Sequence, residues 1–218
     1  MKNLLVFIVS ATILITCFSC EKLLKNDDPS VLNGNQSSMG KVGVKVESSS
    51  VEIAGISNCT ASVTALEGGV SAYSGSATVK NVLLKNLVAN IPGITITGDK
   101  VTATNIQFKL TDEGFECKTG PAAGVLVKYD SNVGDTYPIG STGEVRTVVA
   151  KTDLDDYSYG FYLIKVIQVA ENPSYLKSGS GVTKITYVAN HKYGLVGVKV
   201  AMDDGTNATF PIYTSAEN

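Results

Sequence analysis

The chain has 218 residues, and its 18 basic and 20 acidic side chains give a formal net charge of −2 at neutral pH. A surface that neutralises nucleic-acid phosphates needs an excess of basic side chains, whereas here the lysines are scattered and Arg146 is the only arginine. Composition therefore argues against a nucleic-acid partner. The length suffices for one large domain or two small ones with an apolar core.

The first segment, residues 1–19, has the features of a secretory signal peptide. Lys2 precedes the uncharged run 4–19, LLVFIVSATILITCFS. A membrane-spanning helix needs roughly 20 apolar residues, and this shorter run stops at a small residue beside a cysteine, as a processing site does. The sequence therefore predicts an exported chain from which residues 1–19 are removed. Their removal would leave a net charge of −3.

Two cysteines, Cys17 and Cys20, have a spacing that redox pairs, zinc sites and lipid-attachment signals share. A redox pair needs a thiolate at a helix start in a folded domain, and a zinc site of this type needs a second cysteine pair at a matching spacing. Cys17 lies in the segment predicted to be removed, and the two later cysteines are far apart in the sequence. Ser19-Cys20 therefore favours lipoprotein cleavage, with Cys20 as the acylated first residue.

The residues around Cys20 resemble the lipobox of bacterial lipoproteins. Ser19 occupies the small position before the cysteine, while Cys17 and Phe18 depart from the usual leucine and small residue. This departure is similar to the relaxed lipoboxes of gut-commensal Gram-negative lipoproteins, whose mature chains often begin with Cys-Glu, as here. The resemblance implies palmitate on Cys20 and a lipid anchor in the bacterial outer membrane, with the protein periplasmic or surface-exposed.

Residues 20–40 are polar and lack a sustained hydrophobic period, which predicts a flexible tether after the lipidated cysteine. From residue 41 onward the period becomes two, as at Val42, Val44 and Val46, and turn-forming clusters separate the alternating runs. About a dozen such runs predict an all-β fold, either an antiparallel sandwich or a barrel.

Two β-rich halves are expected in this part of the chain. The loop 130–143, rich in glycine, proline and small polar residues, is the predicted border between a first half, 41–130, and a second half, 144–214. A single continuous β domain over 41–214 is the alternative.

Three segments depart from simple alternation. The apolar phase shifts by one residue within 101–110, which predicts a β-bulge near Asn105. Residues 161–170 are apolar on both phases, which predicts a strand covered on both faces. Residues 79–91 have a nearly helical stripe, but their valines and the following Pro92-Gly93 favour a strand.

The two later cysteines, Cys59 and Cys117, are an even pair in the oxidising compartment that export implies. A disulfide between them is the favoured state, and the chain-entropy model values it at roughly 4 kcal/mol. Two buried free thiols are the alternative, because free cysteine is among the most buried residue types.

Catalytic and metal sites have little support in the sequence. His191 is the only histidine and no Gly-x-Ser-x-Gly occurs, so His191 is expected in a turn and not in a catalytic triad. The acidic stretches 130–135 and 153–156 lack the full loop of a calcium site. We therefore expect no enzyme activity, no metal and no cofactor.

A binding role remains. Sugar-binding β proteins stack ligand rings on exposed aromatic side chains, and nearby carboxylates can accept hydroxyl hydrogen bonds. One candidate set of this kind is Tyr157, Tyr159 and Tyr162 with Asp153, Asp155 and Asp156. Tryptophan is absent from the chain, and tyrosines at the edge of a core are the alternative interpretation.

Three functions follow. The first is a non-catalytic envelope protein that binds a glycan, a peptide or another envelope protein. The second is a carrier of a small apolar ligand in a barrel-type cavity, since VKNVLLKNL and VTATNIQFKL are faintly similar to calycin-like barrel lipoproteins, although the Gly-x-Trp of lipocalins is absent. The third, a hydrolase, has the least support, because no catalytic set of residues is evident. A closed apolar cavity would favour the carrier, whereas tyrosine rings exposed together would favour the glycan binder.

Overall fold

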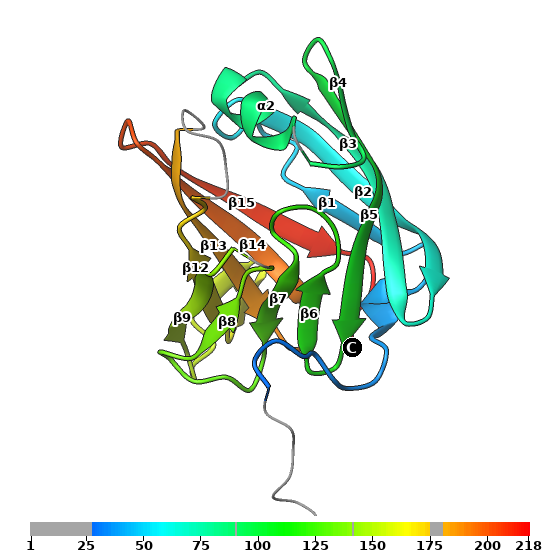
Figure 1. Ribbon diagram of the computed structural model, residues 1–218, viewed down its shortest axis with the longest axis vertical. Coiled ribbons are helices and arrows are strands. Elements are labelled where there is room, and N and C mark those ends of the chain that lie inside the picture. The colour runs from blue at the N-terminus through cyan, green and yellow to red at the C-terminus, as the bar shows by residue number, and fades with distance from the viewer. Residues whose placement is uncertain (1–27, 90, 141, 175–180) are drawn as a thin grey trace, which may run out of the picture.

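The computed structural model describes residues 28–89, 91–140, 142–174 and 181–218 (Figure 1). The predicted signal peptide and Cys20 lie outside these residues. The elements in chain order are η1 (Ser38–Gly40), β1 (Lys45–Ser48), β2 (Ile56–Glu67), β3 (Val70–Val79), α2 (Val82–Val88), β4 (Ile94–Thr97), β5 (Lys100–Thr111), β6 (Gly114–Cys117), β7 (Gly124–Lys128), β8 (Thr136–Pro138), β9 (Val145–Lys151), β10 (Tyr157–Tyr159), β11 (Tyr162–Ile164), β12 (Ile167–Glu171), β13 (Val182–Asn190), β14 (Gly194–Met202) and β15 (Asn207–Thr214).

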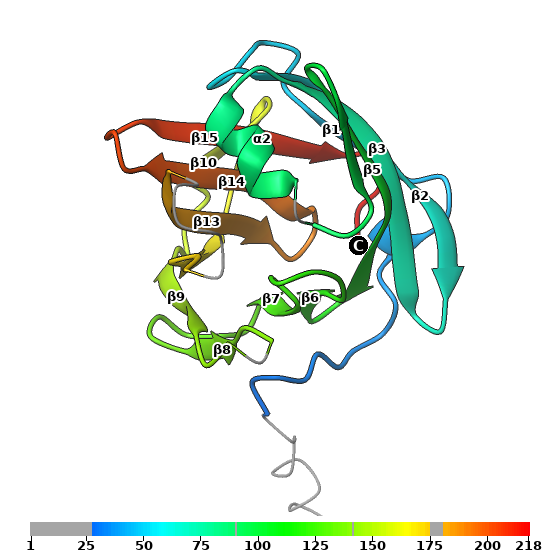
Figure 2. The same ribbon diagram turned by 45° about the horizontal axis from the view of Figure 1, so that its top comes forward.

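One antiparallel sheet curls into a nearly closed barrel (Figures 1 and 2). Its strand order is β7-β6-β5-β3-β2-β1-β15-β14-β13-β12-β9-β8, and β4 pairs with the first part of β5. A separate hairpin, β10–β11, covers part of the outer surface. The predicted all-β fold with about a dozen strands is confirmed, and the sheet is barrel-like, with β7 and β8 as its edge strands.

The two predicted halves of the chain join in this sheet. β1 of the first half pairs with β15 of the second, with Val46 opposite Thr214 and Ser48 opposite Ile212. The predicted border loop, 130–143, contains β8, which pairs with β9. Strands of both predicted halves therefore belong to one sheet.

The predicted bulge is present and the predicted strand over 79–91 is wrong. Tyr73 of β3 lies opposite Ile106 and Gly75 opposite Ala103, so β5 has one extra residue here, and Asn105 has a φ of 56°. Residues 82–88 form α2, because the side chain of Asn81 accepts hydrogen bonds from two backbone amides of its first turn at 2.9 and 3.2 Å. Such a cap stabilises a helix start by about 1 kcal/mol.

The segment 161–170 is two strands and not one. β12 lies between β9 and β13 and is almost completely buried, as predicted for a covered strand. β11 instead belongs to the outer hairpin, and Phe161, Tyr162 and Leu163 are exposed. The hydrophobic pattern of the sequence could not separate β11 from β12, because both an exposed apolar hairpin and a buried strand are rich in apolar residues.

The N-terminal segment 28–40 packs along the barrel, although the sequence predicts a flexible tether over 20–40. Leu32 and Met39 are buried, and Gln36 forms a β-bridge with Thr111 at the end of β5. The carbonyl oxygen of Leu32 accepts a hydrogen bond from Lys109 Nζ at 2.6 Å. This part of the segment belongs to the fold, because its apolar side chains Leu32 and Met39 are buried in the core.

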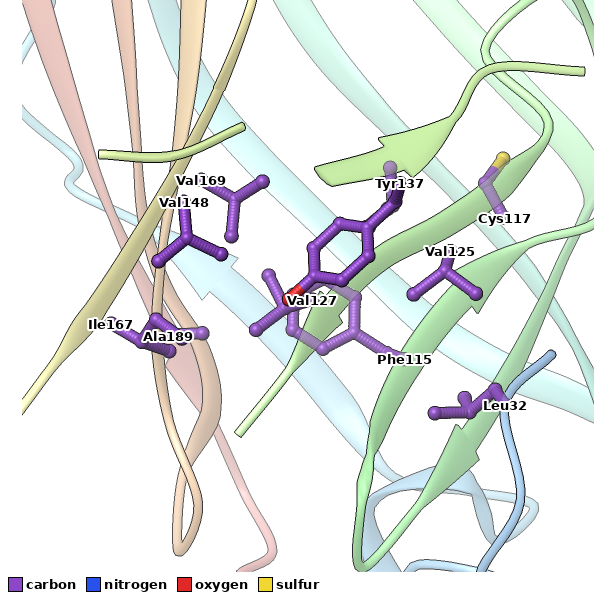
Figure 3. Packing of buried hydrophobic residues seen from close by; sticks show 11 residues of the cluster. Leu32, Phe115, Cys117, Val125, Val127, Tyr137, Val148, Ile167, Val169 and Ala189 are labelled. Carbon is purple, nitrogen blue, oxygen red and sulfur yellow. The ribbon is translucent and has the colours of Figure 1, made fainter. Parts of the chain in front are cut away.

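The core on the β7 side of the barrel is a cluster of eleven buried residues (Figure 3). Figure 3 shows Val148, Ile167, Val169 and Ala189 on one side of the cluster, near the ring of Tyr137 from the edge strand β8. Val125 and Val127 come from β7, the other edge strand. At the opposite end of the barrel, α2 covers a second cluster with side chains from β3, β5, β13 and β14 (Figure 2).

Side chains hold together the two sheet edges that do not pair. Arg146 of β9 is fully buried; its Nη1 donates to the carbonyl of Val125 in β7 at 3.1 Å and its Nη2 to that of Ala122 at 2.6 Å. The Nε atom of Arg146 forms an ion pair with Oε2 of Glu171 in β12 at 2.7 Å. The other carboxylate oxygen of Glu171, Oε1, accepts a hydrogen bond from the hydroxyl of Tyr187 at 2.7 Å. One arginine therefore connects β7, β9 and β12 from inside the barrel.

The predicted disulfide between Cys59 and Cys117 is absent, and both side chains are free thiols. Cys59 lies on β2 and Cys117 on β6, with β3 and β5 between these strands. Neighbouring strands are about 4.8 Å apart, so three intervals separate the two residues by about 14 Å. A disulfide needs Cα atoms closer than about 7 Å.

We expect both thiols to be titratable without reduction. Alkylation of the non-reduced, denatured chain should label Cys59 and Cys117 fully, as read from the masses of their peptides. In the folded chain Cys59 should react faster, because Cys117 is buried and Cys59 only half-buried, although burial raises the pKa of both thiols. Peptides joined through these two cysteines would contradict this assignment.

Candidate functional site: the barrel cavity

An apolar cavity of about 300 Å³ lies inside the barrel. Side chains of β1, β2, β3, β5, β6, β7, β14 and β15 line it, together with Met39 of η1. The largest contributors are aromatic and aliphatic: Tyr73, Ile106, Phe108, Leu110, Phe115, Leu126, Tyr193, Leu195 and Ile212. A volume of this size is at the lower end of the range for small-molecule sites in proteins.

Small residues in one row of the sheet make room for this cavity. Ala103 of β5 lies opposite Gly75 of β3, Gly75 lies opposite Ala61 of β2, and Ala61 lies opposite Val46 of β1. All four line the cavity. The neighbouring row, with Ile106 opposite Tyr73 and Tyr73 opposite Val63, has large side chains. The empty space therefore results from strand register, which aligns small residues that are far apart in the sequence.

A second cavity of about 270 Å³ continues the first toward the end that α2 covers. Val46, Ala61, Gly75, Ala103 and Ile212 line both cavities, so the two meet at this ring of five residues. We call the 300 Å³ space the inner cavity and the 270 Å³ space the outer cavity. The outer cavity is the more open of the two, and its lining adds hydroxyl and thiol groups from Ser48, Thr60, Ser76 and Cys59.

Hydrogen bonds connect the residues beside Met39, which lines the inner cavity, to the C-terminal residues 217 and 218. Ser37 Oγ bonds Asn218 Oδ1 at 2.5 Å, and the side-chain amide of Asn218 donates to the carbonyl of His191 at 2.8 Å. Lys192 forms an ion pair with Glu217 at 3.1 Å, and the side chain of Met39 points into the cavity. This network joins η1, the C-terminus and the β13–β14 turn.

Two buried phenol groups, of Tyr73 and Tyr129, are held in a dry environment. The Tyr73 hydroxyl donates to the carbonyl of Met39 at 3.1 Å, and burial raises the pKa of Tyr73 to about 12. Burial also raises the pKa of Tyr129. Both shifts have the same cause, because removal from water disfavours the charged phenolate.

These shifts predict a loss of stability in alkali. The folded-state pKa of Tyr73 is above the ordinary value of 10, so the unfolded chain releases its proton first as the pH rises. The contribution of the neutral phenol is complete below pH 10 and falls between pH 10 and 12, by up to about 1.4 kcal/mol per pH unit. Urea unfolding at pH 9 and pH 11 measures this slope. Tyr73→Phe should reduce it, and an unchanged slope would contradict the assignment.

The three tyrosines of the candidate glycan site do not share an exposed face. Tyr159 is buried between the rings of Tyr193 and Tyr213, at centroid distances of 5.0 and 5.3 Å. Tyr157 is half-buried, with Lys199 Nζ 6.0 Å from its ring, and Tyr162 is 66% exposed. This arrangement fits the alternative interpretation of tyrosines at the edge of a core, so it does not favour ring stacking by a sugar.

The acidic residues and the histidine lie apart from the barrel cavity. Asp153, Asp155 and Asp156 are exposed in the loop before β10, and His191 is exposed in the turn between β13 and β14, as expected for a turn residue. Asp153 and His191 line a small cavity of about 130 Å³ beside Lys151. Among the described residues, no three acidic, histidine or cysteine side chains are placed to hold a metal ion.

Sequence reasoning missed the inner cavity and its lining. The alternation of apolar residues in β5 shows which side chains face inward, but it does not reveal that Ala103, Gly75 and Ala61 are level with one another.

Within the part of the chain that the structure describes, no helix is both long and apolar enough to cross a membrane.

Comparisons with protein-family models, with curated protein sequences and with solved structures find no match to this chain. The arguments about function therefore rest on the cavities and on the residues that line them.

Proposed function

We propose that the protein is a non-catalytic carrier that binds a small apolar ligand inside its barrel. The observation that supports this proposal is the inner cavity of about 300 Å³, which is lined almost entirely by apolar and aromatic side chains. Transfer of an apolar ligand from water into such a cavity is favourable by about 25 cal/mol for each Å² of apolar surface buried. Natural cores rarely contain voids larger than a water molecule, so an empty space of this size indicates a site that a ligand fills.

The proposal includes the lipid anchor. Palmitate on Cys20 would hold the barrel at the bacterial outer membrane, and only residues 21–27 separate Cys20 from the first described residue, Asp28. A fully extended chain covers about 3.4 Å per residue, so the eight steps from Cys20 to Asp28 span at most about 27 Å. The carrier would therefore stay close to a source of apolar ligands, in the periplasm or on the cell surface.

A binder of glycans, peptides or envelope proteins is the second candidate function. The exposed tip of the β10–β11 hairpin, with Phe161, Tyr162 and Leu163, would be the surface to examine for a protein partner. The barrel cavity favours the carrier, because it is a concave apolar site and the hairpin is a projecting one.

The test is titration with the apolar dye N-phenyl-1-naphthylamine. The full chain carrying Cys20→Ser is used, so that attached acyl groups cannot occupy the cavity. We expect saturable binding with enhanced fluorescence and a loss of at least about tenfold in affinity for Ala61→Leu, whose larger side chain fills the cavity. Ala72→Leu is the matched control, because Ala72 adjoins Tyr73 in β3 and faces outward. Absence of dye binding, or equal binding by both variants, would refute the carrier function.

A further inference from the structure

The barrel wall has a gap where β1 ends. The last residues of β1 in register are Glu47, opposite Thr60 of β2, and Ser48, opposite Ile212 of β15. Beyond this level, residues 56–59 of β2 and 207–211 of β15 continue with no strand between them. The outer cavity lies behind this part of the wall, since Ser48, Cys59 and Ile212 line it.

The loop that leaves β1 turns away from this gap. Ile53 and Ile56 exchange two backbone hydrogen bonds of 2.8 Å, which fold residues 49–55 back onto the start of β2. The carbonyl of Gly55 accepts from the amide of Lys80 at 2.7 Å, and Glu52 forms an ion pair with Lys80 at 2.6 Å. The loop is therefore fastened on the side of β2 that faces β3 and α2.

The ring between the outer and inner cavities has small residues on β2, β3 and β5, namely Ala61, Gly75 and Ala103. A Cβ atom on Gly75 would lie 2.2 Å from the carbonyl oxygen of Thr60 and 2.7 Å from the Cβ of Ala61, so β2 and β3 approach closely here. Val46 and Ile212 bound the same ring from β1 and β15. Space exists on both sides of the ring, so the two cavities form one elongated apolar space.

We infer that the ligand enters through the gap beyond Ser48 and is an unbranched apolar chain, which passes the ring at Ala61, Gly75 and Ala103 with its leading end. This inference rests on the proposed carrier function and adds the class of its ligand. The chain end occupies the inner cavity, and a polar end stays in the outer cavity beside Ser48 and Ser76, whose hydroxyl groups can donate hydrogen bonds. Because the space is elongated, we expect an unbranched chain to bind more tightly than a wider fused-ring compound.

The arrangement makes Ala61 and Ala103 specificity-determining residues. A larger side chain at position 103 of β5 would narrow the passage between the two cavities, whereas the other residues that line the outer cavity would remain accessible. Cys59 provides a reporter for the outer cavity, because its half-buried thiol lies among the lining residues on the side of the gap. A bound chain must lie beside this thiol, so it should shield Cys59 from alkylation.

The experiment compares two fluorescent probes, cis-parinaric acid as an unbranched chain and dehydroergosterol as a fused-ring compound. Both are titrated into the full chain carrying Cys20→Ser, and into the same chain with Ala103→Leu or, as the matched control, Ala72→Leu. We expect the chain probe to bind at least about tenfold more tightly than the sterol, and to lose at least about tenfold in affinity in Ala103→Leu only. Thermal unfolding of each variant confirms that it is folded.

A second measurement does not depend on the variants. Saturation with cis-parinaric acid should slow alkylation of Cys59 several-fold, as quantified from its peptide, with Cys59→Ser as the blank. Sterol binding as tight as chain binding, or unchanged Cys59 alkylation with the chain probe bound, would overturn the inference and leave the carrier function standing. If neither probe nor the naphthylamine dye binds, the carrier function itself fails.

Discussion

Replacing Arg146 by methionine is expected to lower the free energy of unfolding by about 3–5 kcal/mol, the usual cost of leaving a buried charge without its partner. Arg146 and Glu171 are both completely buried, and their side chains meet at 2.7 Å. The same substitution removes the two hydrogen bonds that connect Arg146 to carbonyl groups of Val125 and Ala122. Urea unfolding of the parent chain and of Arg146→Met, followed by circular dichroism, measures the difference.

A matched surface pair gives the control for Arg146→Met. Lys80 and Glu52 form an ion pair at 2.6 Å, but their side chains are 58% and 46% exposed. Lys80→Met should therefore cost far less than Arg146→Met, because water screens an exposed pair. A cost for Arg146→Met as small as that for Lys80→Met would show that Arg146 does not hold the β7 edge.

The double variant Arg146→Met with Glu171→Leu separates two explanations of this cost. Replacing both charges by apolar groups of similar size is often much less destabilising than removing one, because no charge is left unpaired. We expect the double variant to be more stable than Arg146→Met. If it is less stable by the sum of two single costs, the hydrogen bonds to β7 carry the stabilisation and the ion pair does not.

The strands of this fold could be predicted from the sequence because their signal is local. Alternation of apolar residues and the turn clusters between them determine where strands begin and end, and the phase shift within 101–110 predicted the bulge at Asn105. Closure of the barrel could not be predicted in this way. It depends on Arg146, which in the sequence is a single charged residue, and on the pairing of β1 with β15.

The cavity and the absent disulfide both depend on contacts between distant parts of the chain, whereas the error at 82–88 is local. Cys59 and Cys117 are compatible with a disulfide by number and compartment, but two strands separate them in the sheet. The helix at 82–88 had one local signal, Asn81 as its cap, which hydrophobic periodicity does not consider. The inner cavity had none, because only register brings its small residues level.

The N-terminal segment should prove essential to the fold, and Leu32→Ala tests this. Leu32 is 1% exposed and packs against the cluster around Val125 and Val127 (Figure 3), so its truncation should lower the free energy of unfolding by about 2–5 kcal/mol. The neighbouring Val31 is 42% exposed, and Val31→Ala should change the free energy of unfolding by no more than about 0.5 kcal/mol. Equal effects of the two variants in urea unfolding would indicate that the tether extends beyond residue 32. The expected difference would instead place the end of the free tether before Leu32, which limits the distance between the barrel and an acylated Cys20.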